Sequence, residues 1–419
     1  MTLLSIAWAS LWNRRVTAAL AVLSIAMSVA LLLSVEKLRH DARTSFASTV
    51  SGTDLIVGAR SGAIPLLLYS VFRIGNATNN ISIESVEAIR ERDDVAWTIP
   101  LSLGDSHRGY RVLGTDGNYF EHYRHGDDRA LRFVEGRPFD DLFDTVLGSE
   151  VAAALDYELG DAIVVSHGTG SVGLMDHDDQ PFRVAGILAP TGTPVDRTVH
   201  VSLQGIEAMH ADWRSGAPIP GQRTAADTLR ERNLQPRAVT ALMVGLASRR
   251  DVFRVQRTVN EYRDEPLLAI LPGVALQELW NLVGVAARAL LIVSACVVVV
   301  GIVNLVSVLS AGLGERRREI AILRACGARS GQIFSLLTLE AGVLALLGIM
   351  VGVLAHLLAV LLAAPVLEAR FGLAVTAGLP GARDAAMLAL IFAMALLTGA
   401  LPAWRAYRHS LADGLTVRL

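Results

Sequence analysis

Histidine is the residue type whose spacing in this sequence comes nearest to metal chemistry. His122 and His125 are three positions apart, and His177 is followed by two aspartates. Imidazole nitrogens and carboxylate oxygens both bind zinc, but structural zinc sites gather four ligands at tight spacing. The surrounding segments are rich in Asp, Arg and His, as solvated loops are. We therefore expect no bound metal, and His122, His125 and His177 are the candidates for ligands if one is present.

The sequence lacks the short motifs of common hydrolases. It contains no G-x-S-x-G, no H-E-x-x-H and no paired C-x-x-C. A nucleotide-binding P-loop needs a lysine after its glycine loop to reach the phosphates. The only lysine, Lys37, lies between Glu36 and Leu38 and follows no such loop. We predict that the chain is not an enzyme and binds no cofactor itself.

Two ionisable residues, Glu340 and His356, interrupt a long apolar run. Ionisable side chains inside a membrane are costly and often functional, although Glu340 is also placed to snorkel to an interface. Gly348 and Gly352 in the same run form a G-x-x-x-G pair, which permits close approach of another helix. That helix is either another span of this chain or a span of a second copy.

The elements that must position these residues are membrane helices. Of the 419 residues, 52% are hydrophobic, which is too apolar for one ordinary soluble domain. Residues 16–35 carry no charge and are long enough to span roughly 30 Å of hydrocarbon. This run exceeds the apolar core of a signal peptide, and no A-x-A cleavage site follows it. We predict four transmembrane helices, at 16–50 (with an outer stalk), 274–313 (with a stalk), 331–367 and 385–404.

The region between the first two predicted spans is polar and acidic. Residues 36–288 hold 34 acidic and 26 basic residues, a net charge of −8. Short alternating strands and capped helices predict an α+β domain over residues 51–270. The segments 1–15, 314–330 and 405–419 are basic or carry tryptophans on one face, and basic loops remain cytoplasmic. The termini should therefore be cytoplasmic and the α+β domain extracytoplasmic, with the lipid bilayer as a partner and no nucleic acid.

The densest basic patch beside an apolar run is Gly314–Ala328. Its charges fall mostly on one face of a helical pattern, and Ile320, Leu323 and Gly327 fall on the other. Charge alone leaves two interpretations open. The segment is either a short amphipathic helix that presents charge to a cytoplasmic partner, or a solvated loop that only fixes the topology.

The residue pattern of this segment resembles the cytoplasmic turn of MacB-like (FtsX-type) ABC transporter permeases. The matching residues in this turn are Gly301-Ile-Val-Asn304, Glu315, Arg316, Arg318, Glu319, Ile320, Ala321, Ala325, Gly327 and Ala328. Four further blocks resemble the MacB-type periplasmic core domain, at 135–139, 146–151, 159–164 and 182–187. Gly399, Pro402-Ala403 and Arg405-Ala406 are similar to the closing signal of the family, although Asp413-Gly414 departs from it.

The resemblance implies a permease subunit in a bacterial inner membrane. It implies a dimer of permeases with two separate ATPase subunits, which hold the ATP and Mg²⁺, and room for a periplasmic adaptor or substrate-binding protein. The ATPase would dock on Glu315, Arg316, Arg318, Glu319, Ile320, Arg324 and Gly327. Residues Asn304, Glu340, Gly348 and Gly352 would serve transmembrane packing or coupling.

Four kinds of function remain open, three within this resemblance and one outside it. The long first and second helices would relay ATPase motion to the outer domain, for export or extraction of a periplasmic or membrane substrate. A Lol-type permease would use this motion to release lipoproteins. An FtsX-like regulator would control a cell-wall hydrolase instead of transporting anything. A membrane-anchored binding or sensor protein, with no ATPase, is the alternative from outside the family.

Overall fold

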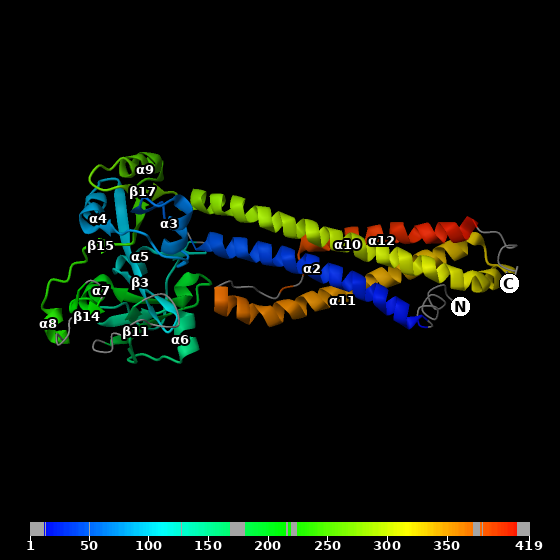
Figure 1. The fold of residues 1–419 in the computed structure, drawn as a ribbon, viewed down its shortest axis with the longest axis horizontal. Coiled ribbons are helices and arrows are strands. Elements are labelled where there is room, and N and C mark those ends of the chain that lie inside the picture. Colours follow the sequence, from blue (N-terminus) through cyan, green and yellow to red (C-terminus); the bar gives the residue numbers. More distant parts are fainter. Residues whose placement is uncertain are drawn as a thin grey trace. The chain divides into compact units, whose positions relative to one another are not determined.

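The computed structural model describes residues 12, 14–49, 51–126, 128–167, 181–214, 217–218, 224–371, 378 and 380–408. The chain forms two compact units. Residues 43–283 form the α+β domain, and residues 1–42 with 284–419 form the helical unit. Figure 1 shows the strands and short helices of the first unit and the long helices of the second.

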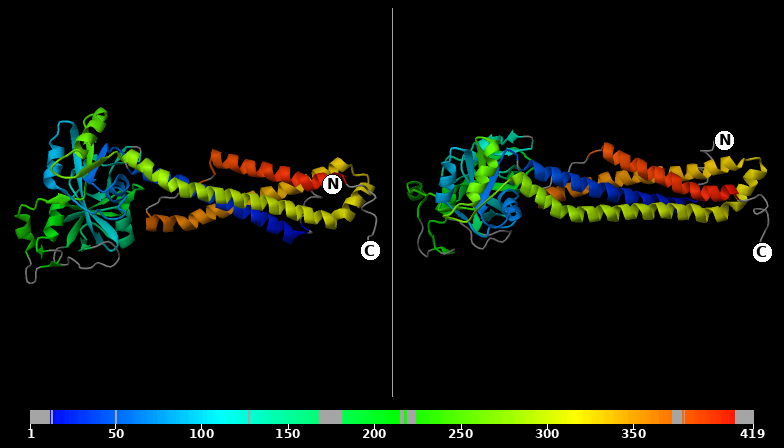
Figure 2. Two further views of the ribbon diagram at one scale, coloured as in Figure 1. Left: turned by 45° about the horizontal axis from the view of Figure 1, so that its top comes forward. Right: turned by 90° about the horizontal axis from the view of Figure 1, so that it is seen from above.

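The long helices in the described part of the chain are α2 (Arg15–Ser48), α10 (Pro272–Ala325), α11 (Ser330–Phe371) and α12 (Ala382–Arg408). Each contains a segment long and apolar enough to cross a membrane, namely Arg15–Thr44, Pro272–Ala311, Ser330–Leu367 and Ala382–Leu401. The four helices run side by side in both views of Figure 2. The predicted fold class, four spans with an α+β domain between the first two, is confirmed.

The interior of the helical unit is a narrow apolar seam. Helix α2 contributes a side chain at every fourth position, Ala21, Ile25, Val29 and Leu33, and these pack against buried apolar residues of α10, α11 and α12. Residues four apart lie on the same face of a helix. The other faces remain apolar and exposed, which suits lipid and not water.

The α+β domain is built on a mixed sheet. The strands follow the order β17-β1-β16-β3-β4-β12-β8-β11-β7, with β10 paired to β3 and β9 paired to β11. The pairs β11·β8 and β12·β4 are parallel, and the other pairs of this sheet are antiparallel. The bounds of these strands are β1 Leu55–Ala59, β3 Val95–His107, β4 Tyr110–Thr115, β7 Phe133–Gly136, β8 Asp144–Leu147, β9 Ala162–Ile163, β10 Ser166–His167, β11 Phe182–Leu188, β12 Thr198–Ser202, β16 Ala241–Leu246 and β17 Leu267–Ile270.

Smaller elements complete the domain. The two-residue strands outside the main sheet are β2 Ile81–Ser82, β5 Arg124–His125, β6 Arg129–Ala130, β13 Trp213–Arg214, β14 Ala217–Pro218 and β15 Ala238–Val239. The helices are α3 Ala63–Ser70, α4 Ile83–Arg90, α5 Asn118–His122, α6 Ser149–Leu155, α7 Leu203–Met209, α8 Ala226–Arg230 and α9 Val252–Asn260, with 3₁₀ turns η1 Pro194–Arg197 and η2 Arg249–Asp251.

The central strands are buried on both faces, which explains why they read as apolar runs. Along β16, Ala241 and Met243 belong to one apolar cluster, while Leu242 and Val244 belong to another on the opposite face. Successive side chains of a strand point to opposite faces. A strand covered on both sides therefore needs an apolar residue at every position.

Several helix bounds differ from the sequence-based ones. Helix α10 continues through the predicted turn at 314–330 as far as Ala325, so the expected separate short helix is instead the last turns of α10. No glycine in the left-handed conformation or proline interrupts it before Gly327. Most of segment 1–15 and most of the tail 405–419 lie outside the described residues, and α12 runs on to Arg408.

Candidate functional site

The structure describes the side chains of the predicted ATPase-docking segment only at the corner between α10 and α11. The last helical residue of α10 is Ala325, and α11 begins at Ser330, so only four residues make the connection. The side chains of residues 312–320 lie outside the described residues, and these include Glu315, Arg316, Arg318, Glu319 and Ile320. The backbone there is helical, which gives these residues helical spacing.

Gly327 ends α10 in a specific way. Its φ of 96° is in the left-handed region, which glycine enters without the steric cost that a Cβ brings. The amide of Ala328 donates to the carbonyl of Leu323 at 3.0 Å, and the amide of Gly327 donates to the carbonyl of Arg324 at 3.0 Å. This pair of hydrogen bonds is the Schellman motif, which satisfies carbonyls that a helix end leaves free.

The start of α11 is fixed to the same corner. The amide of Arg329 donates to Oε1 of Gln332 at 2.8 Å, as in the reciprocal half of a capping box. The Arg324 guanidinium donates to Oγ of Ser330 at 3.3 Å and so joins the two helices. Ile322 is 55% exposed. The corner is therefore a short, hydrogen-bonded hairpin that presents an apolar and basic surface.

The G-x-x-x-G pair of α11 packs on α2 of the same chain. A Cβ on Gly348 would lie 2.7 Å from Cβ of Ile25, and one on Gly352 would lie 2.8 Å from the carbonyl oxygen of Ala26. Both distances are shorter than side-chain atoms tolerate. Of the two partners left open by the sequence, the structure therefore shows a span of this chain at these glycines.

Helices α2 and α10 also meet closely. The Ser28 hydroxyl donates to the Ser24 carbonyl at 2.8 Å, and its Oγ lies 3.0 Å from the carbonyl oxygen of Val297 on α10. A Cβ on Gly301 would lie 2.8 Å from that hydroxyl. Asn304, one turn further along α10, is half-buried. The Gly301–Asn304 stretch thus begins at a close helix contact.

Several polar residues of the helical unit are buried. Glu340 is 2% exposed, so it lies in the interior of the unit and not on its outer surface. His356 is 5% exposed, and its Nδ1 lies 2.9 Å from Oγ of Ser34 on α2. Glu36 is also buried and receives two hydrogen bonds from Arg39. Glu36 follows directly on the first apolar run, but its partners could not be read from the sequence.

The histidines considered for zinc are used differently. His122 stacks on the Trp97 ring with centroids 5.3 Å apart. His125 is buried in β5, and burial is the main cause that lowers its pKa. Within the described ranges, no three His, Cys, Asp or Glu side chains gather as a metal cluster. His177 lies outside the described residues.

Comparison with known proteins assigns the two parts of the chain. The sequence model of the MacB-like periplasmic core domain matches residues 18–262, more than half of the chain, and that of the FtsX-like permease C-terminal domain matches residues 291–411. The chain belongs to the MacB-like ABC transporter permeases. Permeases of this family work with ABC ATPase partners. No match was found among curated proteins.

Two solved structures are similar to the α+β part of this permease. The periplasmic region of MacB from Actinobacillus actinomycetemcomitans has 12% identity and a TM-score of 0.33, over 56% of this chain and 95% of that one. The extracellular domain of the ABC-type transporter YknZ from Gram-positive bacteria has 14% identity and a TM-score of 0.30, over 52% of this chain and 99% of that one.

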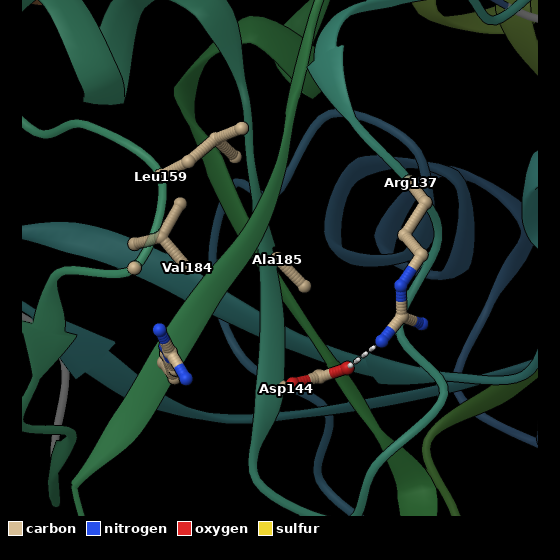
Figure 3. A pocket seen from close by; sticks show the side chains of 7 residues that line it. Arg137, Asp144, Leu159, Val184 and Ala185 are labelled. Carbon is tan, nitrogen blue, oxygen red and sulfur yellow. Dashed lines mark ion pairs between the residues drawn. The ribbon is translucent and has the colours of Figure 1, made fainter.

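The α+β domain of the permease carries an open groove across β11 (Figure 3). Its volume is about 260 Å³, and Leu159, Val184 and Ala185 form its apolar part. Arg137 lies 3.5 Å from Asp144, which is mostly buried and accepts hydrogen bonds from the amides of residues 140 and 141. The ion pair and the apolar strip both line this groove, and Arg137 belongs to the family block at 135–139 that the sequence marked.

His200 is a buried histidine of the domain whose pKa is strongly lowered. It is fully buried in β12 beside the Tyr119 ring, and its Nδ1 lies 3.1 Å from the Val146 carbonyl. Burial, and to a smaller extent the charge of Arg73, lower the pKa of His200 to about 3. The imidazole is therefore neutral at physiological pH and serves the core.

Proposed function

We propose that this permease couples ATP hydrolysis by a separate ATPase subunit to motion of its α+β domain. The observation that carries the proposal is the continuity of α10 over 54 residues. At about 1.5 Å per residue this helix is about 80 Å long, whereas a bilayer core is roughly 30 Å thick. Its first turns, at Ala275 and Leu276, are buried in the core of the α+β domain, and its last turn forms the corner described above.

The proposed docking site for the ATPase is the corner with the preceding turns of α10. The Schellman motif and the Arg324–Ser330 hydrogen bond hold the end of α10 to the start of α11. We therefore expect the two helix ends to move together when an ATPase displaces the corner. Arg316, Arg318 and Glu319 provide charges that can pair with opposite charges on the ATPase. The partner ATPase binds the ATP and Mg²⁺, since the permease has no P-loop lysine.

The proposed assembly is a permease dimer with two ATPase subunits in the inner membrane. Its termini are cytoplasmic and its α+β domain faces the periplasm, where an adaptor or substrate-binding protein has access. The work done there is export or extraction of a periplasmic or membrane substrate. Release of lipoproteins and regulation of a cell-wall hydrolase use the same relay, and reconstitution with the proteins of neighbouring genes distinguishes them.

The test separates hydrolysis from transmission. Val285→Gly with Ala286→Gly, next to Gly284 on the exposed face of α10, costs about 2 kcal/mol of helix stability. Val285→Ala with Ala286 unchanged is the control. We expect the reconstituted complex with the glycine pair to hydrolyse ATP but to lose the ATP-dependent distance change between spin labels at Arg108 of the two protomers. A full distance change in the glycine variant would refute relay through α10.

The docking site has its own test. Arg316→Glu with Glu319→Arg should weaken the stimulation or inhibition of the ATPase by the permease, while Arg288→Glu should not. The purified permease alone should hydrolyse no ATP. If the double variant binds and regulates the ATPase as the wild type does, the corner is not the docking site.

The orientation is tested with the native cysteine at the corner. Cys326 is exposed, and Cys296→Ser leaves it as the sole thiol. A membrane-impermeant maleimide added outside intact cells should label Arg108→Cys but not Cys326. Labelling of Cys326 from outside would contradict the proposed topology.

A further inference from the structure

Helices α2, α11 and α12, together with residues 378, 380 and 381 before α12, line a cavity of about 330 Å³. It lies at the end of the unit where α2 leaves for the α+β domain. Cavities that hold small molecules measure roughly 300–1,000 Å³, so this one accommodates a headgroup-sized molecule and no folded polypeptide. Its ionisable lining residues are Glu36, Lys37 and His40 of α2, His356 of α11, and Arg383 and Asp384 of α12.

The acidic residue deepest in this group is already compensated. Glu36 is 6% exposed and is held by Arg39, with a closest contact of 2.6 Å, and by Arg383 at 3.2 Å. The pairing joins α2 to the first turn of α12. Arg383 contacts Glu36 through Nη1, yet its side chain remains 74% exposed. Most of this side chain is therefore accessible to a ligand or to solvent.

The remaining polar groups provide both signs of charge. Asp384 accepts the Gly381 amide through Oδ2 at 3.0 Å, which leaves Oδ1 to accept another donor. Lys37 pairs with Asp41 at 2.9 Å and has further ammonium hydrogens. Lys37 and Asp384 are the charged neighbours of His356. The lining thus contains two cations and two anions, and one of these anions is neutralised by arginine.

The position of the cavity along the helices sets the kind of ligand. Glu36 and Lys37 follow the charge-free run 16–35 directly, and Arg383 and Asp384 precede the apolar run of α12 directly. A run of about 20 residues matches the hydrocarbon thickness. The charged groups of α2 and α12 therefore lie at the depth of lipid headgroups, and Leu33 adds an apolar wall on the hydrocarbon side.

We propose that this cavity binds the headgroup of a zwitterionic phospholipid, a phosphate diester with a primary ammonium. Arg383 and Lys37 hold the phosphate, since guanidinium and ammonium groups form charge-assisted hydrogen bonds to phosphate oxygens. The free oxygen of Asp384 accepts the ligand's ammonium, and His356, held by Ser34, closes the inner side. The assignment of this lipid to the outer leaflet rests on the orientation in the proposed function, but binding itself does not.

The test is titration calorimetry on the full-length permease in a maltoside detergent, without its ATPase. The probe is dihexanoyl phosphatidylethanolamine, and we expect one saturable site. Asp384→Asn, which keeps the shape of the side chain and an oxygen for the Gly381 amide, should weaken binding about 10-fold or more, as should Arg383→Gln. Arg288→Gln, an exposed arginine of α10 outside the cavity, is the matched control and should bind as the wild type does.

The comparison probes decide between sources of the same chemistry. Dihexanoyl phosphatidylcholine, whose ammonium has no hydrogen to donate, should bind at least about 10-fold more weakly. Glycerophosphoethanolamine and inorganic phosphate should also bind more weakly, since they lack the acyl chains. Equal affinity for inorganic phosphate, equal affinity for the choline lipid, or an equal effect of Arg288→Gln would each overturn the proposal. Because no ATPase is present, these outcomes do not bear on the coupling function. If Arg383→Gln does not fold, the binding measured with Asp384→Asn tests the proposal.

Discussion

Replacement of Gly327 by alanine isolates the backbone conformation at the corner of α10 and α11. A Cβ at Gly327 would meet no atom within 4 Å, so no clash contributes. The φ of 96° is the only obstacle. An L-residue in the left-handed region costs roughly 1–2 kcal/mol, and the reduced freedom of the unfolded chain offsets about 0.4–1 kcal/mol of this.

The net destabilisation of the corner by Gly327→Ala should therefore be about 1 kcal/mol. An opening equilibrium changes about fivefold for 1 kcal/mol. The amides of residues 327 and 328 donate the two capping hydrogen bonds, so their exchange with solvent deuterium should accelerate about fivefold. Hydrogen-exchange mass spectrometry on peptides that cover residues 322–332 measures this directly, after correction for the intrinsic exchange rate of alanine.

Gly331→Ala is the control for this prediction. Gly331 also has open space around it, but it lies in the first turn of α11 without a positive φ. Alanine is favoured over glycine in a helix by about 1 kcal/mol, so exchange at the corner should stay equal or become slower. The exchange rate of Gly327→Asn should fall between those of Gly327→Ala and Gly331→Ala, because asparagine tolerates the left-handed region. Faster exchange in both alanine variants, or in neither, would refute the assignment of a conformational role to Gly327.

Three further predictions concern packing and titration. Gly352→Ala should destabilise the permease by about 1–3 kcal/mol through overpacking, whereas Gly284→Ala, with its nearest atom 3.9 Å away, should not lower the melting temperature in detergent. The folded-state pKa of His200 is about 3, whereas an unfolded histidine titrates near about 6.5, so the unfolded chain takes up the proton first as the pH falls. The free energy of unfolding should therefore decrease by roughly 1.4 kcal/mol per pH unit below about pH 6.5. In denaturant titrations across pH, His200→Gln should remove this slope. Tyr123→Phe removes the 3.2 Å hydrogen bond to the Thr49 carbonyl and should cost about 1–3 kcal/mol, seen as faster hydrogen exchange in the α+β domain; unchanged exchange would show that water replaces the hydroxyl.

Local patterns in the sequence determined the elements of this permease. A run of about 20 residues without charge predicts a span because backbone polar groups inside a bilayer must be satisfied within a helix. The largely apolar runs at 54–57 and 239–246 predict strands for a similarly local reason, and the structure has strands at Leu55–Ala59 and Ala241–Leu246. Helical spacing placed Gly327 on the apolar face of a short helix, whereas in the structure its φ of 96° ends α10. The sequence placed the end of the second span at 313, and the candidate span ends at Ala311, but the helix itself continues to Ala325.

Only the tertiary structure decided which side chains meet. The sequence marked Gly348 and Gly352 as a contact, but the identity of the opposing helix depends on how α2 and α11 are rotated about their axes. The partners of Glu36 come from α2 and from α12, almost 350 positions apart in the chain. Helical periodicity fixes the face on which a residue lies and leaves open which helix covers that face. For this reason the cavity at Glu36, His356 and Asp384 emerged only from the packed helices.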